Sequence, residues 1–124
     1  MSLLLDTHVV LWWLTDDPVL STNVKHRIDD ELGIYVSAAT YWEVSIKQAA
    51  GKLDAPVDLA DAIADNGFRP LPIMFEHAST AGQLPMIHRD PFDRMLVAQA
   101  RCERLTLVTH DPVLEQYDVD LLRV

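Results

Sequence analysis

The chain has 124 residues, of which 49% are hydrophobic and 23% are charged. These values are typical of one globular domain with a buried core, so we expect residues 1–124 to form a single domain. Nineteen acidic and ten basic side chains give a net charge of −9, which argues against the broad basic surface typical of nucleic-acid-binding proteins. Acidic side chains that converge in one cleft can nevertheless bind a divalent cation, and that cation reverses the local sign of the field.

The first residues predict neither a signal peptide nor a membrane span. Asp6 and His8 interrupt the apolar residues at the start, and the longest uncharged apolar run, at 9–14, is too short to cross a bilayer. A single cysteine, Cys102, excludes a disulfide within the chain and a cysteine-based zinc site. We therefore expect a cytoplasmic protein with no membrane partner.

Short apolar runs alternate with helix-like segments along the chain, and caps and glycines mark several of the boundaries. In chain order, the first half is expected to form a strand (3–5), a helix (7–14), a helix capped by Ser21 or Thr22 (20–32), a strand (33–37) and a helix ended by Gly51 (38–52). The second half is expected to form a helix (58–67), an edge strand rich in proline (69–73), a helix (75–84), a loop (86–90), a long helix (91–105), a strand (106–110), a short helix (111–117) and a last strand (120–124).

This alternation predicts an α/β fold, in which a mainly parallel sheet is flanked by helices. Ligands of such folds bind outside the carboxyl ends of the strands. Acidic residues at those ends are therefore candidates for function.

Asp6 and Asp111 both follow apolar strands of the predicted sheet. Each also has a structural explanation, because aspartate is a preferred helix N-cap and Asp111-Pro112 is a cap followed by proline at the first helical position. Taken alone, neither residue distinguishes a cap from a functional carboxylate.

Two further acids belong to helices. In "HRDPFDR", Asp90 is expected to cap the helix, whereas Asp93 shares an otherwise apolar face with residues 96, 97 and 100 and should point inward. Glu43 can form an i,i+4 ion pair with Lys47, but its own face carries mainly small or apolar residues. It should therefore be half-buried or reach into a pocket.

Four converging carboxylates would repel one another unless a cation lay among them. Oxygen ligands of this kind suit Mg²⁺ or Mn²⁺. A metal site of this type can activate water for attack on a phosphodiester and stabilise the leaving oxygen.

The chain resembles the PIN domain nucleases, and within them the VapC-type toxins of bacterial toxin–antitoxin systems. The resemblance rests on "LLLDTHVVLWWL", "VSAATYWEVSIKQAAGKL", "HRDPFDRMLVAQA" and "TLVTHDPVL", in this order and spacing over essentially the whole chain. It implies a parallel sheet of about five strands and a metal-dependent endoribonuclease with one or two Mg²⁺ or Mn²⁺ ions. By motif, the resemblance places the catalytic and metal-binding acids at Asp6, Glu43, Asp93 and Asp111.

The resemblance also implies secondary roles for neighbours of these acids. Thr7 and Thr109 occupy positions where the family often has a hydroxyl that helps to hold metal or water, and Asp90 belongs to the same string as Asp93. In the expected mechanism, Asp6, Asp93 and Asp111 hold the metal. Glu43 positions or deprotonates water, and in-line attack leaves a 5′-phosphate and a 3′-hydroxyl.

Three histidines lie near the acids and raise the alternative of a His/Asp zinc or manganese phosphoesterase. The spacing of His8, His88 and His110 follows no familiar zinc pattern. We expect His88 and His110 to line the cleft mouth or to make local hydrogen bonds, so that replacing any of the three by alanine barely changes metal binding.

Aromatic and basic residues suggest partner contacts. Trp12 and Trp13 are adjacent in a helix and cannot share a face, so one should be in the core and the other can be an exposed anchor for a cognate antitoxin protein. Arg89 and Arg94 flank the acids and are the best candidates for contact with RNA phosphates. The other basic residues near these motifs are expected to form solvated faces, at Lys47, Lys52, Arg101 and Arg104.

The leading hypothesis is a ribonuclease toxin that cleaves RNA and is neutralised by an antitoxin. The alternatives are a housekeeping RNA-processing nuclease of the same fold and a non-catalytic module with an acidic pocket. A phosphate-accepting receiver domain fits poorly, because the chain lacks paired acids after its first strand and a lysine after a late one. The resemblance also implies that a homodimer is possible.

Overall fold

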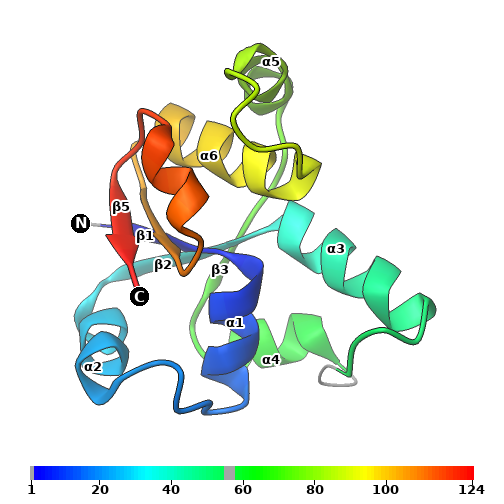
Figure 1. The fold of residues 1–124 in the computed structure, drawn as a ribbon. Helices are drawn as coiled ribbons and strands as arrows, with labels where there is room; N and C mark the ends of the chain where they lie inside the picture. Colours follow the sequence, from blue (N-terminus) through cyan, green and yellow to red (C-terminus); the bar gives the residue numbers. More distant parts are fainter. Residues whose placement is uncertain (1, 55–57) are drawn as a thin grey trace.

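The computed structural model describes residues 2–54 and 58–124. Within them, five strands form one fully parallel sheet with the order β3-β2-β1-β4-β5 (Figure 1). The predicted α/β fold with a parallel sheet of about five strands is confirmed. The strands are β1 (Ser2–Leu5), β2 (Gly33–Ser37), β3 (Arg69–Leu71), β4 (Thr106–Thr109) and β5 (Leu121–Arg123).

The helices and strands lie where the sequence predicts them, with two differences. The last helix, η1, is a 3₁₀-helix. Strand β3 is shorter than the predicted edge strand, because proline cannot donate to a strand ladder. The helices are α1 (Thr7–Leu14), α2 (Thr22–Asp30), α3 (Ala38–Ala49), α4 (Leu59–Asp65), α5 (Phe75–Gln83), α6 (Pro91–Glu103) and η1 (Pro112–Gln116).

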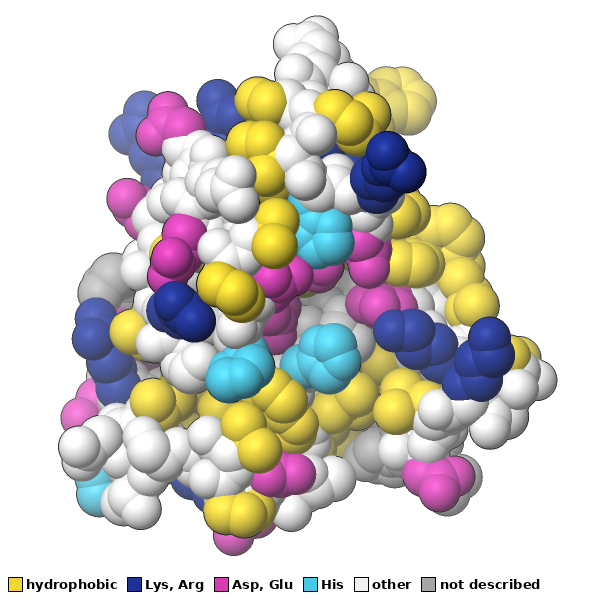
Figure 2. Space-filling view, viewed as in Figure 1, with side chains coloured by type: hydrophobic (Ala, Val, Ile, Leu, Met, Phe, Trp, Pro, Cys, Tyr) yellow, Lys and Arg dark blue, Asp and Glu magenta, His cyan; other side chains and the backbone are white. Residues whose placement is uncertain are grey.

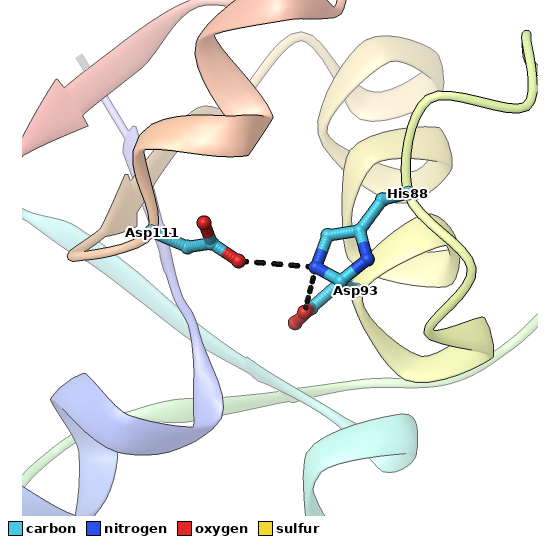
Figure 3. A group of neighbouring side chains, drawn as sticks. All are labelled: His88, Asp93 and Asp111. Atoms are coloured by element: carbon cyan, nitrogen blue, oxygen red, sulfur yellow. Dashed lines mark hydrogen bonds and ion pairs between the residues drawn. The ribbon is translucent and has the colours of Figure 1, made fainter.

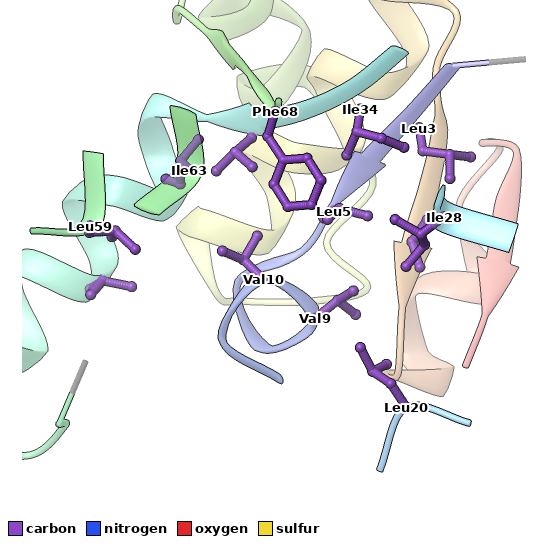
Figure 4. Packing of buried hydrophobic residues seen from close by; sticks show 13 residues of the cluster. Leu3, Leu5, Val9, Val10, Leu20, Ile28, Ile34, Leu59, Ile63 and Phe68 are labelled. Carbon is purple, nitrogen blue, oxygen red and sulfur yellow. The ribbon is translucent and has the colours of Figure 1, made fainter. Parts of the chain in front are cut away.

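The sheet is buried on both faces, as the continuous apolar runs of its strands require. Alternate residues of β1 point to opposite sides, so that Leu3 and Leu5 belong to one apolar cluster and Leu4 to the other. Residues from α1, α2 and α4 complete the first cluster (Figure 4), and residues from α6 and η1 complete the second. Figure 1 shows these two groups of helices on opposite faces of the sheet.

Side chains cap the helices at the junctions between strands and helices. Asp6 and Asp111 accept backbone N–H groups at the starts of α1 and η1, and Ser37 does the same for α3. Gly51, after α3, and Gly67, after α4, have positive φ angles of 69° and 74°. Glycine adopts this left-handed conformation without steric cost, which explains why the predicted glycine stops end their helices.

The topology directs the first and fourth strands to one place. The chain builds β1, β2 and β3 outward in one direction and then returns to add β4 on the other side of β1. The boundary between β1 and β4 is therefore a topological switch point, where open parallel sheets bind ligands beyond the carboxyl ends of their strands. The backbone N–H of Asp6 donates to the carbonyl of Val108, at 3.0 Å, and fixes the two strand ends together.

In the part of the chain that the structure describes, no helix is both long and apolar enough to pass through a bilayer.

Candidate active site

A cavity of about 340 Å³ opens at the carboxyl ends of β1 and β4. Figure 2 shows acidic side chains gathered in a hollow of this face, with histidines around it and basic side chains to one side. Because the boundary between β1 and β4 is the topological switch point of the sheet, the cavity lies at that point. It is lined by Asp6, His8, Trp12, Asp93, His110, Asp111 and Pro112.

Asp6 is nearly inaccessible, with 4% of its surface exposed. Its Oδ1 accepts the backbone N–H of Val9 at 2.9 Å, and its carboxylate also accepts a hydrogen bond from Thr109. Burial raises the pKa of Asp6 above its ordinary value, although these hydrogen bonds oppose the shift. The carboxylate is thus both a helix cap and a wall of the cavity.

Asp93 lies in the first turn of α6 and points into the same cavity. Burial raises the pKa of Asp93 to about 7, and the negative charges of Asp90, Asp6 and Glu43 add to the shift, while His88 opposes it. A carboxyl group held among other carboxylates in this way gains from a nearby cation.

Asp111 follows β4 and caps η1, where its Oδ1 accepts the N–H of Val113 at 2.9 Å. Its other oxygen, Oδ2, lies 3.0 Å from Nε2 of His88, and Oδ2 of Asp93 lies at the same distance from this nitrogen. Figure 3 shows the imidazole between the two carboxylates. Among the described residues, these three are the group of His, Asp and Glu side chains whose ligand atoms lie close enough together to share a metal ion.

Glu43 is brought to the edge of this group by α3. It is 5% exposed, its Oε1 accepts the hydroxyl of Thr7 at 2.6 Å, and its Oε2 accepts Nζ of Lys47 at 2.7 Å. The Thr7 hydroxyl also lies 3.2 Å from that of Thr40. The predicted Glu43–Lys47 pair is confirmed, and Glu43 stands close enough to Asp93 to raise its pKa.

Thr109 and Asp90, for which the sequence predicts secondary roles, form hydrogen bonds beside the acids of the cavity. Oγ1 of Thr109 accepts the backbone N–H of Asp111 at 3.1 Å, in addition to its hydrogen bond with the Asp6 carboxylate, so one hydroxyl connects the Asp6 side chain with the backbone of Asp111. Asp90 caps α6 through its Oδ1, which accepts the N–H groups of Phe92 and Asp93. Asp90 is thus the cap and Asp93 the inward acid, as expected.

The structure corrects the expectation that Arg94 contacts RNA phosphate. Arg94 is only 9% exposed, and its guanidinium donates to the carbonyls of Ala81, Leu84 and Pro85 at 2.9, 3.1 and 3.0 Å. These bonds hold the connection between α5 and α6, so the arginine has a structural role. Arg89 is exposed, and its predicted contact with RNA stays a prediction.

The two adjacent tryptophans differ in their surroundings. Trp13 packs against Phe68 and donates its Nε1–H to Asn66 at 3.0 Å, whereas Trp12 faces the acidic cavity and contacts the ring of His110. His110 lies at the cavity, as expected, and its Nδ1 donates to the carbonyl of Val124, which is 14 residues away in the sequence.

Two candidate residues escaped the sequence reasoning. His88 was expected at the cleft mouth but lies between two acids, and Trp42, which is 60% exposed beside an apolar groove, received no role. The position of Trp42 in "YWEV", next to Glu43 but on a different helical face, was the available signal for its exposure.

The donor set of the cavity fits a divalent cation. Asp6, Asp93 and Asp111 supply carboxylate oxygens from three separate elements, and burial together with the negative charges of neighbouring acids raises the pKa of Asp93. Hard oxygen donors of this type are those that Mg²⁺ and Mn²⁺ prefer. These three residues could hold the ion, with Glu43 beside it.

Comparisons with known proteins agree with this architecture. The sequence model of the PIN domain family matches residues 3–120. "Ribonuclease VapC22" of Mycobacterium tuberculosis is 30% identical over 94% of this chain and 92% of its own length. The fold is similar to that of VapBC2 from Rickettsia felis bound to a promoter DNA fragment, with a TM-score of 0.75, 14% identity and 99% and 98% of the two chains covered. DNA-bound VapBC from Salmonella typhimurium gives a TM-score of 0.74 at 18% identity, with the same coverage. The chain therefore belongs to the PIN domain family.

Proposed function

We propose that this protein is a divalent-cation-dependent endoribonuclease that acts in the cytoplasm as the toxin of a toxin–antitoxin pair. The observation that carries the proposal is the convergence of Asp6, Asp93 and Asp111, from three distant segments, on one cavity at the switch point of the sheet. The similarity to a relative named as a ribonuclease supports the choice of RNA as substrate.

In the proposed mechanism, the carboxylates of Asp6, Asp93 and Asp111 would hold Mg²⁺ or Mn²⁺. When bound, such an ion lowers the pKa of a coordinated water and stabilises the charge that develops on the phosphate. Glu43 receives the proton of the attacking water. The Thr7 hydroxyl and the Lys47 ammonium, which each hold one oxygen of this carboxylate, fix its direction. In-line attack at phosphorus then yields a 5′-phosphate and a 3′-hydroxyl.

The antitoxin is proposed to dock in an apolar groove of about 520 Å³ between α3 and α4. Exposed Tyr41 and Trp42 lie on the α3 side, Ala60 and Ile63 on the α4 side, and Phe68 at the floor. Contiguous apolar surface of this kind marks a protein-binding site. A partner with an apolar segment for the groove and basic side chains would complement the net charge of −9. Trp42 is therefore the proposed aromatic anchor in the groove, and the predicted partner contact of Trp12 or Trp13 stays a prediction.

The proposed activity is tested by Asp6→Asn and Asp93→Asn. Each change keeps the shape of the side chain and removes one anionic ligand. We expect Mg²⁺- or Mn²⁺-dependent cleavage of total RNA to fall by more than the roughly 10- to 100-fold loss typical of outer-shell changes. Mapping of RNA 5′ ends after induced expression would identify the target and detect toxicity together.

Asp118→Asn is the matched control, because it neutralises an exposed aspartate outside the cavity. Circular dichroism should show an unchanged fold in all three variants. Full activity of either cavity variant would refute the assignment of its carboxylate. Absence of cleavage of any RNA by the wild type would instead favour a non-catalytic acidic module, and activity without growth inhibition would favour a housekeeping nuclease.

A further inference from the structure

His88 occupies an unusual position between two of the proposed cation ligands. Its Nε2 is 3.0 Å from Oδ2 of Asp93 and 3.0 Å from Oδ2 of Asp111, while the three side chains come from the α5–α6 connection, from α6 and from the turn after β4 (Figure 3). One nitrogen thus bridges two carboxylates.

The other ring nitrogen determines which atom carries the proton. The backbone N–H of Asp90 donates to Nδ1 of His88 at 3.3 Å. A neutral imidazole has one donor nitrogen and one acceptor nitrogen, so an Nδ1 that accepts leaves the proton on Nε2. The Nε2–H group can then donate to both carboxylates, and it offers no lone pair to a metal ion.

This tautomer is the opposite of the one that metal-binding histidines adopt. A histidine that binds a metal through Nε2 donates its Nδ1–H to a carbonyl, carboxylate or water. Here Nδ1 faces a donor. The geometry therefore argues against His88 as a ligand and for His88 as a hydrogen-bond donor to the ligands.

The backbone of His88 is held in place from both sides. Its N–H donates to the Tyr117 hydroxyl at 2.8 Å, and its carbonyl accepts from the Arg94 guanidinium at 3.4 Å. The Tyr117 hydroxyl in turn donates to the carbonyl of Pro85 at 3.2 Å. The imidazole is thus delivered to the two carboxylates by a fixed segment rather than by a free loop.

We propose that His88 is a positioning residue that bridges Asp93 and Asp111 in the cation-free protein, and that a divalent cation must displace its Nε2–H to bind. The bridge keeps the two carboxylates together when no cation is present. It also competes with the cation for the same oxygens, so that His88 sets how tightly the site binds metal. This inference rests on the proposed function, because it takes Asp93 and Asp111 to be cation ligands.

The test is calorimetric titration of the purified, cation-free protein with Mn²⁺ and with Mg²⁺ at about pH 8, where imidazole side chains are ordinarily neutral. We expect His88→Ala to bind the cation roughly 3- to 10-fold more tightly than the wild type, because no hydrogen bond to the ligands has to be broken. His88→Gln should remain near the wild-type dissociation constant, since its amide N–H can replace the Nε2–H.

Two further measurements report on the hydrogen-bonded bridge itself. The melting temperature of His88→Ala should fall below that of the wild type in EDTA, and this deficit should shrink at saturating Mn²⁺. Nitrogen-15 spectra of the histidine side chains should show the Nε2–H tautomer for His88 in the cation-free protein. His110→Ala is the matched control, because His110 lies in the same cavity but donates to the carbonyl of Val124.

The outcomes separate this inference from the proposed function. Weaker binding by His88→Ala would make His88 a ligand, and unchanged binding would show that it does not compete; either result overturns the inference. If Asp93→Asn abolishes cation binding in the same series, the proposed function stands whether His88→Ala binds the cation more weakly or with unchanged affinity. If Asp93→Asn binds the cation as well as the wild type does, the proposed cation site itself is wrong.

Discussion

Asp93 shows how a single carboxyl group can serve a cation site at the expense of the cation-free fold. Its pKa is raised to about 7, first by burial and then by the charges of Asp90, Asp6 and Glu43. In the unfolded chain an aspartate titrates near 3.9, so between these two values the folded protein holds a proton that the unfolded chain has released. The contribution of Asp93 to stability is fully present below about pH 4 and is lost as the pH rises through about 7.

Asp93→Asn should therefore stabilise the cation-free protein at high pH. At about pH 8 we expect its free energy of unfolding to exceed that of the wild type by on the order of 2 kcal/mol, after allowance for partial exposure of the group. The difference should shrink toward about pH 4, where the wild-type carboxyl group is protonated in both states. Urea unfolding in EDTA at several pH values measures it.

The control for this prediction is Asp118→Asn, which removes an exposed charge and should leave the pH dependence unchanged. A constant difference between Asp93→Asn and the wild type across this pH range would contradict the raised pKa. The raised pKa of Asp93 also predicts how the wild-type activity depends on pH, because a protonated Asp93 is a poor cation ligand. Cleavage should increase with pH, and because a bound cation lowers the pKa of its carboxylate ligand, the midpoint should lie below about 7 and move down as the cation concentration rises.

At the scale of elements, the connection between α5 and α6 does more than join two helices. Arg94, from the first turns of α6, donates to carbonyls of Ala81, Leu84, Pro85 and His88. A guanidinium has five donors in a rigid fork, which lets one side chain satisfy several carbonyls of a turn. The same bonds place His88 between the acids.

Arg94→Ala should destabilise the protein by roughly 3 kcal/mol, because it leaves several carbonyls of the connection without a donor. Arg101→Ala, an exposed position on the same helix, should change the free energy of unfolding by less than about 0.5 kcal/mol. Chemical denaturation of both variants measures the difference. An Arg94→Ala protein of wild-type stability that binds RNA more weakly would restore the original prediction of a phosphate contact.

The elements themselves could be predicted because their signals are local. The apolar run at 3–5, the cap and proline at Asp90-Pro91 and the glycine stop at Gly51 each reflect a preference of a few neighbouring residues. The convergence of Asp6 and Asp111 also follows, because parallel strands end at the same edge of a sheet.

The position of His88 could not be predicted in this way. It depends on contacts with Tyr117 and with Asp111, which are 29 and 23 residues away in the sequence. The role of Arg94 was missed for the same reason, since an arginine beside two aspartates has no local sign that its partners are the carbonyls of a preceding turn. Long-range contacts of this kind are set by packing and leave no periodic trace in the chain.

At the scale of the whole molecule, the two proposed contact surfaces are separate. The acidic cavity lies at the carboxyl ends of β1 and β4, whereas the apolar groove lies between α3 and α4 beside β2 and β3. Glu43 and Trp42 are neighbours in α3, yet the first is buried near the cavity and the second is exposed at the groove. One helix therefore contributes both to the proposed catalytic site and to the proposed antitoxin site.

Trp42→Ala should weaken antitoxin binding without loss of nuclease activity. A buried interface tryptophan commonly contributes at least about 2 kcal/mol, which corresponds to roughly a 30-fold rise in the dissociation constant. The probe is the purified product of the gene adjacent to the one for this chain, titrated against this protein. Phe75→Ala, a change at a still more exposed aromatic residue on α5, should leave the affinity unchanged. Equal binding by the wild type and Trp42→Ala would place the antitoxin elsewhere.

The hydrogen bond between His110 and Val124 has a practical consequence for work with this protein. Because β5 runs parallel to β1, its carboxyl end lies at the same edge of the sheet as the acidic cavity, and Val124 contacts a residue that lines it. A purification tag or fluorescent fusion attached after Val124 would lie beside the proposed entrance for RNA, and a histidine tag there would bring metal-binding imidazoles to the proposed cation site. Attachment before β1 starts from the opposite edge of the sheet and keeps that entrance clear.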